Sequence, residues 1–332
     1  MERRVIERER TVEVLLATYN GERFLREQVD SILSQSYGPL RITARDDGSS
    51  DGTVGILEGY ERRYPERFRV LRDGVRAGGA KWNFVRLMEQ STAPFVCLAD
   101  QDDVWKRDKV RDSMAAMLGL RERHGDEVPL LVFSDLEVVD AELRSLYPSF
   151  WRLGRIAPGN IHRLERLLTQ NVLTGCTAML NRRLAQLAVR MTDEVFMHDG
   201  WIALIASAMG AAAYLDEPTV LYRQHESNVV GAKKVARAKL IPRWRFHDLR
   251  REQWERSERQ GAALLRVMRG ELPERAVRLL EAYTACETSP YRLRRVWNLV
   301  RHGFFVNALR PNLAMLWYLW DMKAAKRQMG KG

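Results

Sequence analysis

The sequence predicts an α/β fold, built as an open and mostly parallel β-sheet with helices on both faces. In the first hundred residues, short apolar runs typical of buried strands alternate with stretches in which apolar residues recur at helical spacing. A strand–helix–strand order favours parallel pairing, because parallel neighbours need a crossover connection, usually a helix. The chain has 332 residues, 45% of them hydrophobic, which is enough for one large domain and an extension.

The first half of the sheet is expected to contain four strands with three helices between them. The strands are predicted at residues 11–17, 40–44, 68–71 and 94–99, and the helices at 24–33, 54–63 and 81–91. Polar loops at 18–21, 46–53 and 100–103 follow three of these strands. Ligands of such sheets bind beyond the carboxyl ends of the strands, so the three loops are expected to meet at one binding edge.

The second half of the core is expected to add three more strands, at 130–135, 172–180 and 212–215. A linker rich in Pro, Gly and aromatic residues is expected at 147–160, followed by helices at 161–169 and 201–209. After residue 231 the pattern is helical and basic. The sequence is therefore divided into a core, residues 1–230, and a helical extension, residues 231–332.

Three carboxylates, Asp100, Asp102 and Asp103, follow the predicted strand at 94–99 within four residues. Carboxylates this close repel one another strongly unless a cation lies between them. Mg²⁺ and Mn²⁺ prefer oxygen ligands, and either ion would in turn hold the phosphates of a nucleotide. The alternative is a polar loop in which Asp103 caps the next helix, and the cluster by itself is compatible with both.

The net charge of +11 is concentrated in the C-terminal third. Residues 231–332 carry 23 Lys and Arg against 9 Asp and Glu, whereas residues 1–230 have a net charge of −3. A basic tail is typical of proteins that meet an anionic surface, either membrane lipid or nucleic acid. Trp297 lies there on an apolar helical face, and Trp317 and Trp320 lie in an apolar run too short to cross a bilayer. Aromatic residues among basic ones favour peripheral contact with an anionic membrane. Packing on the catalytic domain or on a partner subunit is the alternative.

Cysteine usage and the chain termini indicate a compartment. Cys97, Cys176 and Cys286 are widely spaced and form no paired or zinc-binding motif. The first ten residues are highly charged and lack the apolar segment of a signal peptide, and no apolar stretch approaches the roughly 20 residues needed to span a bilayer. We therefore expect a cytoplasmic protein that works at the inner face of the plasma membrane.

Several motifs of the core resemble glycosyltransferase family 2, whose members have the GT-A fold. They are Ala17-Thr18-Tyr19-Asn20-Gly21, Asp46-Asp47-Gly48-Ser49-Ser50-Asp51-Gly52-Thr53, Asp100-Gln101-Asp102-Asp103 and His198-Asp199, spread over roughly residues 11–230. The segments at 100–105, 198–201 and 222–228 are most similar to the bacterial rhamnosyltransferase branch. This resemblance implies an inverting, metal-dependent transfer from a dTDP- or UDP-sugar, with rhamnose expected. The acceptor would be a hydroxyl of a glycan or a lipid-linked intermediate in bacterial surface polysaccharide synthesis.

The resemblance implies a donor site on the first two loops. Thr18, Tyr19 and Asn20 would frame the base of the nucleotide-sugar, with the Tyr19 ring either offering a face or simply packing. Asp47 would accept a hydrogen bond from the N3–H of uracil or thymine, because an ionised carboxylate can only accept. Asp46 would bind there too or brace the loop.

Further donor contacts are implied along the chain. Asp100 would bind the ribose or a water around the metal, and Gln101 belongs to the same donor-binding segment. Lys81 is a candidate for phosphate contact, with a solvated surface position as the alternative. Arg223 is assigned to the phosphates.

Asp102, Asp103 and His225 are the implied metal ligands. The two aspartates would flank the ion, and the spacing leaves open which of them binds it directly. His225 would serve the metal or the diphosphate, because imidazole is an acceptable ligand of Mn²⁺. The ion, Mg²⁺ or Mn²⁺, would bind the diphosphate and stabilise it as it leaves.

Asp199 is the implied general base, since inverting transfer needs a carboxylate on the acceptor side to remove the hydroxyl proton. It would also suit the N-cap of the helix at 201–209, where the helix N-terminus is expected to lower its pKa and keep it ionised. His198 and Trp201 are expected to lie near the acceptor. Gly175 and Cys176 would line the acceptor pocket through their backbone, or pack only.

Other functions were weighed against this one. A nucleotidyltransferase that makes the activated sugar needs a glycine-rich loop bearing Lys or Arg after the first strand, and residues 18–22 match that poorly. A nucleic-acid-binding protein would use the basic tail, but the tail has no helix-turn-helix or zinc-finger spacing, so no nucleic-acid partner is expected. A nucleotide-sugar-binding protein without catalysis is disfavoured by the joint presence of Asp47, Asp102 and Asp199.

Overall fold

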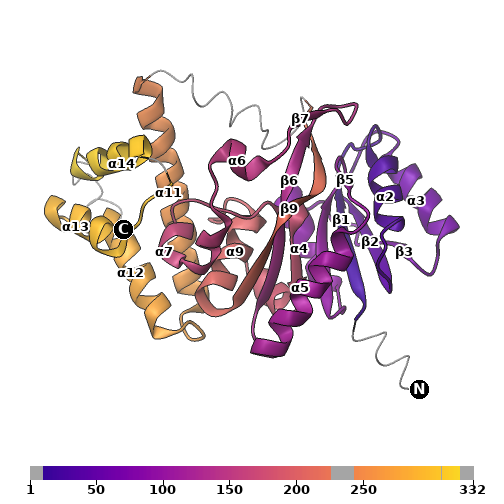
Figure 1. Ribbon diagram of the computed structural model, residues 1–332, viewed down its shortest axis with the longest axis horizontal. Helices are drawn as coiled ribbons and strands as arrows, with labels where there is room; N and C mark the ends of the chain where they lie inside the picture. Colours follow the sequence, from indigo (N-terminus) through magenta and orange to yellow (C-terminus); the bar gives the residue numbers. More distant parts are fainter. Residues whose placement is uncertain (1–9, 226–242, 308, 322–332) are drawn as a thin grey trace.

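The computed structural model describes residues 10–225, 243–307 and 309–321. Within these residues one nine-stranded sheet runs through the core with helices on both faces, and four C-terminal helices stand together at one end (Figure 1). The strand order is β3-β2-β1-β4-β8-β6-β9-β5, and β7 pairs with β6. The predicted α/β class with a helical extension is confirmed.

The N-terminal half of the sheet is parallel. It consists of β1 (Val12–Thr18), β2 (Leu40–Asp46), β3 (Phe68–Val70) and β4 (Phe95–Asp100). In the register of β1, Thr18 is opposite Asp46 on one side and Ala17 is opposite Asp100 on the other. The polar loops after β1, β2 and β4 therefore leave the sheet at the same edge, as the sequence predicted.

The second half of the sheet is mixed. It consists of β5 (Val104–Trp105), β6 (Leu130–Val139), β7 (Ser145–Tyr147), β8 (Met179–Asn181) and β9 (Ala211–Arg223). β8 runs antiparallel between β4 and β6, and β9 runs parallel to β6 with shifts of register around Asp135. β9 returns the chain to the edge at which β4 ends, because it pairs with β5 and its last residue, Arg223, donates its N–H to Asp103.

Two hydrophobic clusters cover the two faces of the sheet. Alternate strand residues separate between them, so that Leu15 belongs to one cluster while Val14 and Leu16 belong to the other. The first cluster receives α4 (Ala80–Gln90), α7 (Leu164–Leu167), α8 (Arg182–Ala188) and α9 (His198–Met209). The second receives α2 (Leu25–Leu33), α3 (Thr53–Arg63) and α5 (Lys109–His124), and a short α6 (Phe150–Gly154) contacts β6.

Some expected elements differ from the structure. Of the run at 172–180, only Met179–Asn181 enters a strand, while Gly175–Thr177 forms a 3-10 turn in which the Thr177 hydroxyl donates to the Thr174 carbonyl. The run is apolar because it passes through the core. The helix expected at 161–169 is a 3-10 turn, Pro158–His162, followed by α7. Asp103 is not a helix cap, since α5 begins at Lys109 with Asp108 before it.

The C-terminal helices pack on the core. They are α11 (Arg243–Met268), α12 (Glu274–Thr288), α13 (Arg292–His302) and α14 (Leu309–Asp321). α11 contacts α9 and α12 contacts α7, and buried side chains such as Trp254, Leu264 and Tyr283 belong to the same cluster as the core helices. No helix among the described residues is long and apolar enough to cross a membrane. The packing alternative for the tail is thus observed, while part of its surface remains outward.

Candidate functional site

The loop after β2 forms a dense hydrogen-bond network. Asp46 accepts from the Thr18 hydroxyl at 3.0 Å and from the backbone N–H groups of Gly48 and Ser49. This is the bracing role that the sequence left open for Asp46. The positive φ of Gly48, +87°, is a conformation that a glycine adopts without strain.

Asp47 is buried, and protein donors surround its carboxylate. It accepts from the backbone N–H groups of Ala77, Gly78 and Gly79, the last at 2.8 Å. Arg45, fully buried, lies 3.5 Å from it. An ionised carboxylate has about four acceptor positions, and these contacts take them up. The structure therefore shows Asp47 holding the glycine loop 77–79.

Tyr19 is the exposed aromatic residue of the loops after β1, β2 and β4. Its backbone N–H donates to the Gln101 side chain at 2.7 Å, and its carbonyl accepts from the same amide at 2.8 Å. Its ring is about half exposed, and the Arg76 guanidinium lies 5.7 Å from the ring centroid. Asn20 closes the turn with a positive φ of 50° and accepts from Ser50 N–H. The loops after β1, β2 and β4 are thus tied together around one exposed aromatic face.

Lys81, a candidate for phosphate contact, is directed toward the segment that precedes α9. Its ammonium donates to the carbonyls of Val195 at 2.8 Å and Asp193 at 3.4 Å. It also lies 4.7 Å from the Trp82 ring centroid. In this structure Lys81 fastens α4 to the segment that precedes α9.

Asp102 and His225 come together although 123 positions separate them. The Nε2 of His225 lies 2.7 Å from an Oδ of Asp102, and both side chains are partly exposed. The His225 ring also packs 5.0 Å from the Phe24 ring. Sequence reasoning grouped these two residues, and the structure places them side by side.

Arg223 lies beneath this pair and is almost completely buried. Its guanidinium donates to the carbonyls of Asp102 and Ala141 and pairs with Glu27. It also stacks 4.5 Å from the Phe24 ring. The structure shows Arg223 positioning the Asp102 loop, and a phosphate contact would require it to exchange these partners.

Asp103 points away from Asp102, into the protein. One oxygen accepts from Arg223 N–H at 3.3 Å, and the other receives no N–H or O–H hydrogen bond from the described residues. Burial raises the pKa of Asp103 well above its usual range, with the charges of Asp102 and Asp100 adding to the effect. Candidate ligand atoms of Asp100, Asp103 and Cys176 lie within 4.8 Å of one another. This buried group is a second candidate cation site beside the Asp102–His225 pair.

Asp199 occupies the first turn of α9 and shares an electrostatic environment with Asp100. Burial raises its pKa to about 6, although the backbone N–H of Gly200 and the side chain of Asn171 act in the opposite direction. The expectation that the helix N-terminus would lower its pKa is wrong, because desolvation outweighs those hydrogen bonds. Nor is Asp199 an N-cap, since α9 begins at His198 and Met197 precedes it. Burial and the charges of Asp102 and Asp199 raise the pKa of Asp100 to about 7, so the carboxylates at the end of β4 and at the start of α9 influence each other.

His198 is enclosed by the protein. It is 4% exposed, its ring lies 4.4 Å from the Phe84 ring, and neither nitrogen has a hydrogen-bond partner among the described residues. Burial lowers its pKa to about 4, so the ring is neutral. A Cβ built on Gly175 would lie 2.5 Å from His198 Nε2, so glycine is required for this close approach. Trp201 is fully buried in the core cluster and offers no surface to an acceptor in this structure.

Sequence reasoning missed three residues around these groups. Asn171 hydrogen-bonds Asp199, and Gln260 on α11 approaches α9 so closely that a Cβ on Gly200 would lie 2.9 Å from its Nε2. Lys109 is a buried cation that donates to the Thr177 carbonyl at 3.1 Å. Only Lys109 could have been recognised from the sequence, because it lies on the same helical face as apolar residues that are expected to be buried. The other two are brought in by tertiary packing from distant segments.

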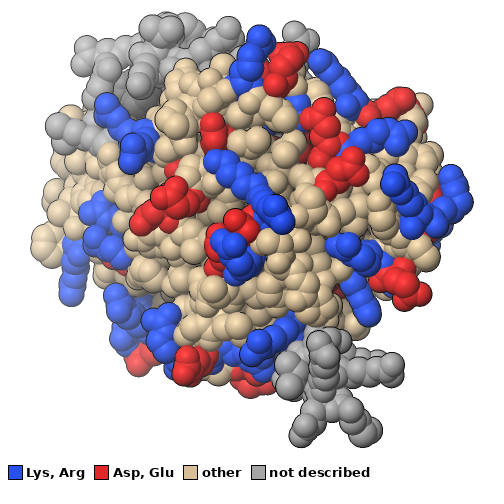
Figure 2. Space-filling view, turned by 45° about the vertical axis from the view of Figure 1, so that its right-hand side comes forward, with Lys and Arg blue, Asp and Glu red and all other residues tan. Residues whose placement is uncertain are grey.

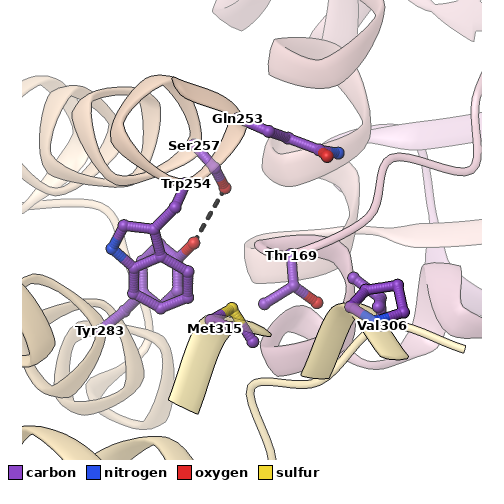
Figure 3. A pocket seen from close by; sticks show the side chains of 8 residues that line it. Thr169, Gln253, Trp254, Ser257, Tyr283, Val306 and Met315 are labelled. Atoms are coloured by element: carbon purple, nitrogen blue, oxygen red, sulfur yellow. Dashed lines mark hydrogen bonds between the residues drawn. The ribbon is translucent and has the colours of Figure 1, made fainter. Parts of the chain in front are cut away.

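Two further features of the molecule are a pocket and a charged face. A pocket between α11, α12, α14 and Thr169 is lined by Trp254, Tyr283 and Met315 and contains none of the site carboxylates (Figure 3). On the face shown in Figure 2, Lys and Arg alternate with Asp and Glu rather than forming a continuous basic field.

Solved structures share this fold. TarS of S. aureus (residues 1–349, in complex with UDP-GlcNAc) aligns with a TM-score of 0.54 and 16% identity, over 88% of this chain and 80% of that one. A mannosyltransferase from Pyrobaculum calidifontis, solved with GDP-Man and Mn²⁺, aligns with a TM-score of 0.50 and 18% identity, over 92% and 78%. These neighbours show a GT-A fold with a helical C-terminal region.

The family follows from the sequence comparison. The model of "Glycosyl transferase family 2" matches residues 13–186, which is just over half of the chain. A dTDP-rhamnosyl transferase, RfbG of Shigella flexneri, is 28% identical over 254 residues, 73% of this chain and 81% of that protein. The chain belongs to glycosyltransferase family 2 and is a glycosyltransferase, with a rhamnosyltransferase among its relatives.

Proposed function

We propose that this glycosyltransferase moves a sugar, with inversion, from a dTDP- or UDP-sugar onto a hydroxyl of a glycan or lipid-linked acceptor in bacterial surface polysaccharide synthesis. The relative named a dTDP-rhamnosyl transferase favours rhamnose as that sugar. The observation that carries the proposal is the position of Asp199. It combines burial, a pKa of about 6 and proximity to Asp100 at the edge where the donor loops meet.

Asp199 acts as the general base. Its carboxylate takes the proton of the acceptor hydroxyl while that oxygen bonds to the anomeric carbon and the bond from this carbon to the diphosphate breaks. Attack from the side opposite the leaving group inverts the configuration. A pKa near 6 leaves the group mostly ionised at neutral pH and makes it a stronger base than an ordinary aspartate.

Asp102 and His225 fit a divalent cation better than the buried group does. Their ligand atoms are 2.7 Å apart, and neighbouring ligands of an octahedral ion at about 2.1 Å lie about 3 Å from each other. A bound Mg²⁺ or Mn²⁺ would neutralise the departing diphosphate there. Asp103 and Cys176 have no exposed surface, so a donor does not reach an ion held between them. The mannosyltransferase neighbour solved with Mn²⁺ supports the use of a divalent ion.

The nucleobase of the donor would lie on Tyr19, whose ring is the exposed aromatic surface of the three loops. Recognition of N3–H by Asp47 would require one backbone N–H of the loop 77–79 to move aside, because that loop occupies the carboxylate. Positive φ angles at Gly78 and Gly79 give this loop a backbone that only glycine adopts readily. We therefore propose that the loop 77–79 rearranges when the donor binds.

Asp199→Asn tests the base. Transfer should fall by about 10²–10⁴-fold with donor binding retained, since the amide cannot take up the proton. The measurements are nucleoside diphosphate release and the thermal shift caused by the donor. Asp216→Asn, at an exposed carboxylate on β9, is the matched control and should leave both unchanged. Full turnover by the Asp199 variant would refute the assignment.

Metal use is tested with a panel of nucleotide-sugars in Mn²⁺, Mg²⁺ or EDTA. We expect stabilisation by one dTDP- or UDP-sugar that depends on the ion and is lost in Asp102→Asn and in His225→Gln. If the response instead survives in these variants and disappears in Cys176→Ala, the ion belongs to the buried group. A lipid-linked acceptor would also bring the enzyme to the inner face of the plasma membrane, as a peripheral contact.

A further inference from the structure

The helices α13 and α14 carry apolar side chains on their outward faces. On α13, Leu293, Trp297 and Val300 are 74%, 58% and 50% exposed, at the i, i+4, i+7 spacing of one helical stripe. On α14, Leu313, Trp317 and Trp320 repeat this spacing, all about half exposed. The two helices contact each other at the end of the molecule farthest from β3 (Figure 1). We name these six side chains the outer face.

Packing on the opposite side fixes which residues face outward. Arg295 is 2% exposed and donates to the carbonyl of Ser289 at 2.6 Å and of Leu319 at 3.5 Å. Leu299 and Leu319 are fully buried in the core cluster. A half-buried aromatic, Tyr318, reaches back toward α11. The outer face is therefore held outward by a packed inner face and does not result from a loosely attached helix.

On α13, exposed positive charge lies beside the outer face. Arg292, Arg294 and Arg301 are exposed on α13, and this helix contains no Asp or Glu. Exposed tryptophan beside arginine suits the boundary between lipid headgroups and acyl chains, where an anionic surface attracts basic residues. A symmetric contact with a second copy would instead place these arginines against like charges.

We propose that the outer face of α13 and α14 seats the enzyme on an anionic lipid bilayer. The tryptophans enter the interface and the arginines contact the headgroups. This names the surface for the membrane contact proposed above, and in that sense it rests on the proposed function. Its test needs neither donor nor acceptor, so a failure here leaves glycosyl transfer untouched.

Vesicle co-sedimentation tests the surface with the full chain. Vesicles of phosphatidylglycerol and phosphatidylethanolamine should bind at least about tenfold more tightly than vesicles of phosphatidylcholine, and salt should weaken the binding. The double variant Trp297→Gln, Trp317→Gln should lose at least about tenfold in affinity, as should the triple variant Arg292→Gln, Arg294→Gln, Arg301→Gln. Leu146→Gln, at an exposed apolar residue on β7, is the matched control and should bind like the parent.

A second readout covers the case of a variant that folds poorly. Brominated lipids should quench part of the tryptophan fluorescence of the unmodified protein in anionic vesicles. Absent binding, or equal binding to both kinds of vesicle, overturns the proposal. So does a dimer that the tryptophan variant converts to monomer, because the outer face would then be a contact between copies.

Discussion

The loops after β1 and β2 and the surroundings of α9 differ in how their buried polar groups are satisfied. In the loops after β1 and β2, Asp46 and Asp47 accept hydrogen bonds from protein donors at nearly every position. By contrast, both ring nitrogens of His198 and the indole nitrogen of Trp201, on α9, have no hydrogen-bond partner among the described residues, and neither has one oxygen of Asp103. The fold therefore satisfies the polar groups of the loops, whereas these enclosed groups keep unused hydrogen-bonding capacity.

Electrostatics separates the two regions in the same way. Beside the loops, the guanidinium of Arg45 lowers the pKa of Asp73 below its usual range. Beside α9, burial raises the pKa of Asp199 to about 6 and of Asp100 to about 7. Carboxyl groups with a lowered pKa therefore lie beside the loops, and those with a raised pKa lie beside α9. Groups with strongly perturbed pKa values tend to cluster at active sites.

The largest expected effect is loss of stability on the donor side. Asp47→Ala would leave the N–H groups of the loop 77–79 without their acceptor and lower the free energy of unfolding by about 2–3 kcal/mol. Arg45 keeps its bond to Asp73, which limits the loss. Denaturant unfolding measures it, and Asp47→Asn, which retains one acceptor oxygen, should cost less. An unchanged stability would mean that the loop does not depend on this carboxylate.

Gly175→Ala should disturb the acceptor side through one contact. Its Cβ would meet His198 Nε2 at 2.5 Å, and such overpacking costs about 1–2 kcal/mol. Truncating the imidazole removes the obstacle, so Gly175→Ala should cost less in a His198→Ala background than in the parent. A double-mutant cycle on the thermal midpoint measures this coupling. Strict additivity would show that the two residues do not contact each other in solution.

The pH dependence should distinguish Asp199 from an ordinary carboxylate. The base must be ionised, so kcat/KM should fall about tenfold per pH unit below pH 6 and be level above it. The sign for stability is opposite. Because the folded-state pKa lies above the unfolded value, the contribution of Asp199 is full below pH 4 and is lost as the pH rises to about 6. Asp199→Asn should remove that loss, and an acid limb near pH 4 would contradict the assignment.

The smallest effect is expected at the exposed edge of the donor loops. Tyr19→Phe removes only a hydroxyl that accepts from Arg76 at 3.3 Å, so the free energy of unfolding should change by less than about 0.5 kcal/mol. Tyr19→Ala should likewise leave stability nearly unchanged but raise the KM for the donor, because it removes the ring. Equal donor KM values in both variants and the parent would show that the nucleobase of the donor does not bind at Tyr19.

The sequence predicted the N-terminal half of the fold closely because local signals agree there. Apolar runs mark the four parallel strands, and three of these strands end where a polar motif begins. The pairing of Asp102 with His225 was also anticipated, through the family resemblance. These positions depend on strand ends, which the sequence marks directly.

What the sequence did not reveal depends on packing between distant segments. The run at 172–180 looks like a strand because burial alone makes it apolar, yet only its last two residues enter β8, and Gly175–Thr177 forms a 3-10 turn. The pKa of Asp199 was predicted in the wrong direction because local sequence shows the helix N-terminus but not the depth of burial. Gln260, 61 positions after Asp199, was not anticipated at all, because only the packing of α11 against α9 brings it there.

The contact between Gln260 and Gly200 limits how this enzyme can be recombined with its relatives. For an exchange of the C-terminal segment with that of a relative, residue 231 is the junction that the sequence suggests. An exchange there would replace the α11 side chain that adjoins the first turn of α9. In a functional chimera, the relative that supplies the C-terminal segment must therefore have a side chain of matching size at position 260. Otherwise α9 of that relative must be exchanged together with the segment.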